Sequence, residues 1–198
     1  MQLAIRIVVS AIALAVATVP LAAQRREVVM RLYAGGADHL ADLSSGSPDA
    51  SFTPGYNVGA SVGQPLSDLL TVRADLMFTR NSAWGAASFG GAQVNRFYYD
   101  VQLEARRTWG QRWVPFTLVG AGAVSVDQLG PDRFEPFTKA AFTLGGGMGY
   151  AIPGSRMEAF GEVKGITYKW DRAGFNHTMF DVTYSLGLSY RPPVRLPF

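Results

Sequence analysis

Hydrophobic and polar residues alternate without a break between Phe180 and Tyr190, where the chain reads FDVTYSLGLSY. Every second residue is apolar or aromatic, and the residues between them are small or polar. Successive side chains of a β-strand point to opposite faces, whereas a helix needs apolar residues at a period near 3.6. The pattern therefore predicts a strand with one apolar face. Such a strand fits either a half-buried soluble sheet or a membrane barrel whose apolar face meets lipid.

Seven earlier segments show the same alternation, so the chain is expected to hold eight strands. The clearest is 94–107, where Phe97 and Tyr99 alternate with Tyr98 and Asp100. Glycines leave the register of two segments open, and a third, 157–168, places Phe160 and Ile166 on the same face as its charges, which predicts a bulge or a different register. The seven segments are 27–34, 56–63, 70–79, 94–107, 114–125, 141–150 and 157–168.

The connections between these segments alternate strictly between long and short. The long ones are 35–55, 80–93, 126–140 and 169–179, and the short ones are 64–68, 109–112 and 152–155. An antiparallel meander puts successive connections at opposite ends, so all four long ones are expected at one end. Membrane barrels have this asymmetry, whereas a Greek-key sandwich has no reason for it. The predicted fold is all-β: an eight-stranded antiparallel up-and-down transmembrane β-barrel.

Composition agrees with a membrane barrel and excludes several kinds of site. Of the 198 residues only 17% are charged, below the roughly 25% that is usual in soluble domains. The net charge of +3 comes from scattered residues, which argues against nucleic-acid binding. The chain has no cysteine and two histidines, so thiol chemistry is excluded and neither a metal site nor a cofactor is expected.

The first 23 residues have the layout of a cleaved secretory signal. Arg6 precedes an apolar run that ends at Pro20, and small residues up to Ala23 precede a polar segment. The alternative is a membrane anchor, but the run is shorter than the ~20 apolar residues that a spanning helix needs. We expect cleavage after Ala23 and a single barrel domain over 24–198.

Three further segments resemble the small eight-stranded outer-membrane barrels, the OmpA membrane-domain and OmpX-like family: PFTLVGAGAVSV (115–126), TLGGGMGYAIPGSR (143–156) and VTYSLGLSYR (182–191). The resemblance covers 24–198 and implies location in the bacterial outer membrane, with membrane lipids, lipopolysaccharide and the barrel-assembly machinery as partners. That family often ends its barrel at a terminal aromatic residue read by the machinery. Here a proline-rich segment, 191–197, separates Tyr190 from Phe198, which departs from the pattern.

The two faces of such a barrel carry different candidate residues. Inward charges form a predicted lumen charge network of Arg31, Arg73, Asp75, Asp100, Glu104, Arg106, Glu158, Glu162 and Lys164. Predicted membrane-interface aromatics near strand ends are Tyr56, Phe78, Phe97, Trp109, Trp113, Tyr150, Trp170 and Tyr190. Because side chains fill an eight-stranded barrel, we expect a plugged, non-conducting lumen; a small gated pore or proton path is the alternative.

The role expected from these features is structural, or one of surface contact through the long connections, with an unknown extracellular ligand. Lys139, Lys169 and Arg172 could meet lipopolysaccharide phosphates. An alternative is a lipid A or phospholipid-modifying enzyme, but only His39 and His177 could supply an imidazole base, and both are expected to be exposed in loops. A third possibility is a soluble periplasmic lipocalin-like barrel with its apolar faces turned inward.

Overall fold

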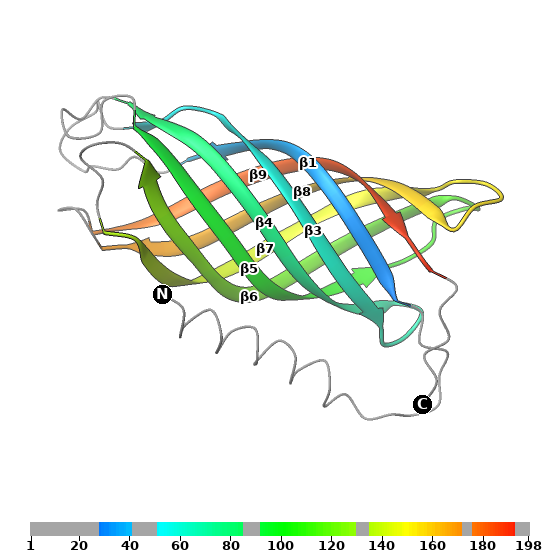
Figure 1. Cartoon of the computed structure of the whole chain (residues 1–198). Helices are drawn as coiled ribbons and strands as arrows, with labels where there is room; N and C mark the ends of the chain where they lie inside the picture. The colour runs from blue at the N-terminus through cyan, green and yellow to red at the C-terminus, as the bar shows by residue number, and fades with distance from the viewer. Residues whose placement is uncertain (1–27, 41–50, 85–91, 130–134, 172–175, 193–198) are drawn as a thin grey trace.

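The computed structural model describes residues 28–40, 51–84, 92–129, 135–171 and 176–192, and these form a closed antiparallel β-barrel (Figure 1). This confirms the predicted all-β, eight-stranded architecture. The barrel strands are β1 (Val29–His39), β3 (Gly55–Pro65), β4 (Leu70–Trp84), β5 (Gln93–Arg106), β6 (Trp113–Leu129), β7 (Phe137–Ala151), β8 (Met157–Trp170) and β9 (His177–Tyr190). A two-residue strand, β2 (Ser51–Phe52), pairs with the end of β4 outside this ring.

Each barrel strand pairs with the strands before and after it in the chain, and β1 closes the ring against β9. Met30 pairs with Tyr190 at one end of this closing seam, and His39 pairs with Asp181 at the other. The short turns after β3, β5 and β7 therefore lie at one end of the barrel, called here the turn end. The strand ends that the long connections join lie at the opposite end, called here the loop end. Gly110 and Gly154 have positive φ angles of 65° and 70° in two of these turns, a conformation that glycine adopts without steric cost.

The strands are longer at the loop end than the sequence pattern predicts. Strand β4 continues to Trp84 rather than Thr79, and most of the predicted connection 126–140 belongs to β6 and β7. The outward residues of these extensions are mostly polar, including Arg80, Ser82 and Asp127. The contrast between an apolar outer face and a polar inner face is lost where the outer face becomes polar, so the pattern stops before the strand does.

Side chains alternate between a buried lumen and an exposed apolar outer surface. Leu32, Leu144 and Leu186 are among the most exposed residues, and Leu186 is 75% exposed. On β8 the pairing with β9 is regular from Met157 to Trp170, so the predicted bulge is absent. The register read from the sequence, with Phe160 and Ile166 on the same face as the charges, is therefore correct. Phe160 and Ile166 point inward beside the charges, because this lumen holds apolar as well as ionised side chains.

Parts of the sequence prediction fall outside the described residues. These include the signal peptide at 1–23, Arg172 and Phe198. Among the residues that the structure describes, no helix is long and apolar enough to cross a membrane.

Candidate functional site

The residues of the predicted lumen charge network all lie inside the barrel. They come from β1, β4, β5 and β8, and none is more than 8% exposed. Eight of the nine join one chain of ion pairs that occupies the turn-end half of the lumen. The ninth, Asp100, is held by hydrogen bonds from Gln102 Nε2 at 2.9 Å and from Thr143 Oγ1 at 2.6 Å rather than by a cation.

In the part of the network near the turn end, Glu104 is the carboxylate with the most ion-pair partners. The Arg31 guanidinium binds it through both nitrogens, with Nη1–Oε2 and Nη2–Oε1 distances of 2.6 and 2.8 Å. Arg73 Nη1 approaches the same carboxylate at 3.3 Å. Arg106 Nη1 lies 3.5 Å from Glu104, and Arg106 Nη2 binds Glu158 at 2.5 Å. Three guanidinium groups thus surround one carboxylate, which offsets the cost of burying it.

Two further ion pairs cross the full width of the barrel. Strands β4 and β8 are four positions apart in the eight-membered ring, so they face each other across the lumen. Arg73 Nη2 on β4 binds Glu162 on β8 at 2.8 Å, and Lys164 Nζ on β8 binds Asp75 on β4 at 2.8 Å. Lys164 also contacts Glu162 at 3.0 Å. These contacts join opposite walls of the barrel directly at this level.

Aromatic rings lie beside two cations of the network, Arg31 and Lys164. The Arg31 guanidinium lies 5.4 Å from the ring centre of Phe116 and 5.2 Å from that of Phe160. Lys164 Nζ lies 4.7 Å from the ring centre of Tyr33, whose hydroxyl donates to Asp75 at 2.8 Å. Cation–π contacts of this kind stabilise buried charges, which explains why Phe160 shares a face with acidic residues.

A second buried cluster, which the sequence reasoning missed, lies nearer the loop end. His39 Nδ1 forms a hydrogen bond with Asp181, and the Tyr98 hydroxyl donates to the same carboxylate. Arg96 Nη1 lies 3.0 Å from His39 Nε2, and Arg96 Nε donates to the Tyr168 hydroxyl at 2.9 Å. This His39–Asp181 cluster draws on four strands, β1, β5, β8 and β9.

The expectation that His39 is an exposed loop residue is wrong. Its side chain is 1% exposed, because β1 continues five residues past the predicted end at Ala34 and turns His39 inward. His177 lies at the first position of β9 and is partly exposed. The inward positions of Arg96 and Asp181 could have been recognised, since both share a face with other inward residues of predicted strands.

A group of aromatic side chains, called here the aromatic cap, lies at the loop end of the lumen next to this cluster. Trp170 packs against Phe137 and Phe52, with ring centres 5.0 and 6.0 Å apart, and the Arg96 guanidinium lies 4.2 Å from the ring centre of Phe52. The assignment of Trp170 to the membrane interface is therefore wrong. Trp170 is 0% exposed because it is two residues beyond Tyr168 on the inward face of β8.

The other predicted interface aromatics lie on the outer surface. Toward the loop end, the rings of Tyr56, Phe78 and Phe97 form a row across β3, β4 and β5, with successive centres 6.3 and 6.4 Å apart. At the turn end, Trp113 packs on Tyr150 at 5.0 Å. Trp109 and Tyr190 are also exposed at the turn end. The outward aromatics thus gather at two levels, with aliphatic residues between them.

No group of three or more His, Asp or Glu residues within the described ranges is arranged to hold a metal ion. The buried carboxylates are balanced by the side chains of arginine and lysine instead. Across both clusters the side chains contact one another at hydrogen-bonding distance.

Comparison with known proteins identifies the family of the chain and its fold. A sequence model of the outer membrane protein beta-barrel domain matches residues 11–191. No curated protein sequence matches the chain.

Several solved structures share the fold at low sequence identity. Neisserial surface protein A has a TM-score of 0.59 at 13% identity, over 83% of this chain and 97% of that one. OprG from Pseudomonas aeruginosa has a TM-score of 0.56 at 15% identity, over 86% and 98%. The attachment invasion locus protein Ail of Yersinia pestis, solved with the heparin analogue sucrose octasulfate, has a TM-score of 0.50 at 15% identity, over 85% and 100%.

Proposed function

Because the chain belongs to the outer membrane protein beta-barrel family, we propose that it is an integral protein of the bacterial outer membrane with a closed, non-conducting lumen. Its role in this proposal is to present the long connections and the loop-end rim for contact at the cell surface. Outer-membrane lipids and lipopolysaccharide would surround it, and the barrel-assembly machinery would insert it.

The proposal of a non-conducting lumen rests on one observation, namely that ion pairs join β4 to β8 across the barrel. Arg73–Glu162 and Asp75–Lys164 occupy the same level, and all four side chains are buried. An ion would have to separate these pairs, and uncompensated buried charges are costly. The Trp170 cap adds a second, apolar obstruction at the loop end.

The outer surface supports insertion in a membrane. Exposed aliphatic residues such as Leu144 and Leu186 lie between the two levels of outward aromatics. This is the arrangement expected of a lipid-facing band with aromatic residues at both interfaces. It also counts against the lipocalin-like alternative, in which the apolar face would line the lumen.

The alternative of a lipid-modifying enzyme gains no support from the histidines. The His39 imidazole is buried, and both of its nitrogens already contact Asp181 and Arg96. An imidazole that serves as a general base must reach its substrate within hydrogen-bonding distance. None of the three neighbours described above is named as an enzyme, and two of them are named as a surface protein and an attachment protein.

Planar-bilayer recording on the purified, folded chain tests the closed lumen. We expect no stable conductance from the native protein. The double variant Arg73→Ser, Glu162→Ser should increase conductance, because it removes one trans-lumen pair and leaves the net charge unchanged. A stable, sizeable conductance of the native protein would overturn the proposal. Heat-modifiable migration on gels, measured on the same samples, confirms that each is a folded barrel.

Loop replacement tests the surface role. Short Gly-Ser turns would replace the connections at 40–50, 85–92, 130–136 and 171–176 while the strands stay intact. Cells that display the native chain should adhere to host-cell or glycan surfaces more strongly than cells that display the loopless barrel. Adhesion that survives removal of all four connections contradicts contact through the connections and leaves the loop-end rim as the contact surface, without affecting the closed-lumen proposal. A native chain that gives no adhesion above that of cells without it contradicts the surface role as a whole.

A further inference from the structure

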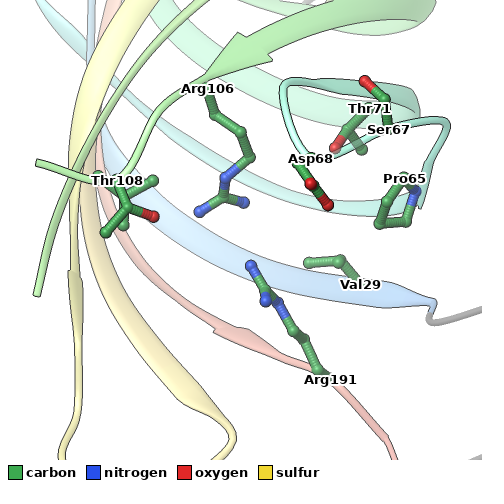
Figure 2. A pocket seen from close by; sticks show the side chains of 9 residues that line it. Val29, Pro65, Ser67, Asp68, Thr71, Arg106, Thr108 and Arg191 are labelled. Carbon is green, nitrogen blue, oxygen red and sulfur yellow. The ribbon is translucent and has the colours of Figure 1, made fainter. Parts of the chain in front are cut away.

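The turn end of the barrel is hollowed into two adjoining pockets of about 350 and 450 Å³. They share Thr108, Val114 and Arg191 in their linings, so they form one basin at the mouth of the lumen. Figure 2 shows the first pocket, where the guanidinium groups of Arg106 and Arg191 point toward the same space from β5 and from the end of β9. We call this basin the turn-end mouth.

Arginine dominates the charge of the turn-end mouth. Four arginines line it, namely Arg106, Arg112, Arg156 and Arg191, against two acidic residues, Asp68 and Glu158. Glu158 already binds Arg106 at 2.5 Å, so it neutralises a charge that belongs to the lumen charge network. Within the described residues, Arg112, Arg156 and Arg191 form no ion pair with a carboxylate. The mouth therefore has an excess of positive charge that the described side chains leave unbalanced.

The fold holds these three arginines on neighbouring strand ends. The Arg191 backbone N–H donates to the Arg156 carbonyl at 3.1 Å, directly beyond the last β8–β9 pair, Met157 with Tyr190. The Ala151 N–H donates to the Arg112 carbonyl at 2.9 Å. Like charges placed opposite each other on adjacent strands are destabilising. An anion bound between Arg156 and Arg191 would relieve this repulsion.

An anion could reach Arg156 and Arg191 from water or from the lipid headgroups, depending on which side of the barrel wall these arginines lie. Tyr190 and Met157 are exposed on the outer surface, so Arg191 and Arg156, one position further along, share the parity of the inward face. The inward residue Ser189 lines the same pocket. The mouth thus opens to the aqueous side of the rim, away from the lipid-facing surface.

We propose that the turn-end mouth binds a soluble oxyanion with two or more negative charges, of the phosphate or polycarboxylate class. In this proposal Arg156 and Arg191 bind the anion, and Arg112 contributes a third positive charge. Guanidinium groups bind such anions through paired N–H donors, which makes arginine better suited to this site than lysine. The proposal does not depend on whether the lumen conducts or whether the loops bind a partner.

Binding of pyrophosphate and citrate to the full mature chain tests the proposal. The protein would be held in uncharged detergent micelles at low salt, and binding would be followed by calorimetry. We expect saturable binding of both anions. The double variant Arg156→Gln, Arg191→Gln should weaken it by about tenfold or more, since charge-assisted hydrogen bonds are lost. A matched control, Arg80→Gln with Arg107→Gln, removes the same charge from residues that line neither pocket and should bind as tightly as the native chain.

Three outcomes would overturn the proposal. One is the absence of saturable binding by the native chain, and another is equal weakening in the control, which would reveal a response to net charge alone. The third comes from nanodiscs with and without phosphatidylglycerol. If the Arg156→Gln, Arg191→Gln variant loses retention of that lipid yet binds pyrophosphate normally, the arginines serve a membrane lipid and the soluble-anion site is wrong. Heat-modifiable migration of every variant ensures that the comparison is made between folded barrels.

Discussion

His39 and Asp181 face each other across the seam at which the first and last strands close the barrel. They are register partners on β1 and β9, their side chains are each 1% exposed, and His39 Nδ1 is hydrogen-bonded to the Asp181 carboxylate. Arg96 extends the contact to β5 on the far wall through His39 Nε2. The loop end of the closing seam is therefore fixed by a buried polar contact as well as by the backbone ladder.

Removing the Asp181 charge should destabilise the barrel strongly. Asp181→Asn leaves the buried Arg96 guanidinium without its carboxylate, and breaking a buried pair typically costs about 3–5 kcal/mol. Urea unfolding of protein reconstituted in vesicles measures the free energy. The control Asp68→Asn, at an exposed turn position, should stay within about 0.5 kcal/mol of the native value. A loss below about 1 kcal/mol in Asp181→Asn would show that the cluster does not stabilise the seam.

Two lysines with ion-pair partners should respond very differently to substitution. Lys164→Met removes the cation between Asp75 and Glu162 inside the lumen and should cost about 3–5 kcal/mol in unfolding free energy. Lys139→Met breaks the partly exposed pair with Asp171 at the loop end, which should cost about 0–1 kcal/mol. The same urea titration compares both variants. Equal losses would contradict the inference that the trans-lumen pairs are shielded from water.

Alanine substitutions at Trp170 and Trp109 compare a tryptophan buried in the aromatic cap with one exposed at the turn end. Trp170→Ala leaves a cavity in the aromatic cap and should cost about 3–5 kcal/mol, as for other buried large-to-small changes. Trp109 is 71% exposed at the turn end, and Trp109→Ala should cost clearly less. Unfolding followed by the remaining tryptophan fluorescence measures both. If Trp109→Ala proves the more damaging change, the cap contributes little to stability.

Arginine substitutions along the outer face of β9 locate the lipid-facing band. Leu186→Arg places a charge among exposed aliphatic side chains and should cost about 2–4 kcal/mol in vesicles, as for charges near a bilayer midplane. Thr178→Arg lies on the same face near the loop end and should cost about 0–1 kcal/mol. Urea unfolding of both variants reconstituted in vesicles measures the two costs against the native chain. A similar cost at both positions would show that the band does not lie where the outward leucines are.

The directions in which the side chains point could be predicted because a strand has a period of two. All nine charges of the lumen network follow from alternation within single strands, without knowledge of any neighbour. Their partners could not be predicted in this way. Arg73 and Glu162 are 89 residues apart, and their contact depends on how the strands are staggered around the closed ring.

The errors concentrate at the loop end for a physical reason. There the outer face is polar, as at Arg80 and Asn95, while the inner face becomes aromatic, as at Trp170. The usual rule that apolar residues mark the outside of a membrane barrel is inverted in this region. The sequence pattern therefore ended β1 too early, assigned His39 to a loop and assigned Trp170 to the membrane interface.

The extended loop end also has a mechanical consequence. Strand β6 has 17 residues, which at about 3.4 Å per residue and a tilt near 45° rise about 40 Å, more than the apolar band of about 25 Å. The surplus forms a collar of hydrogen-bonded strands with a polar exterior, where Tyr99, Ser125 and Thr138 hydroxyls bond across β5, β6 and β7. A binding partner that docks on this collar meets a preformed surface, so association costs little ordering entropy. Lengthening or shortening the connections would leave such a surface in place.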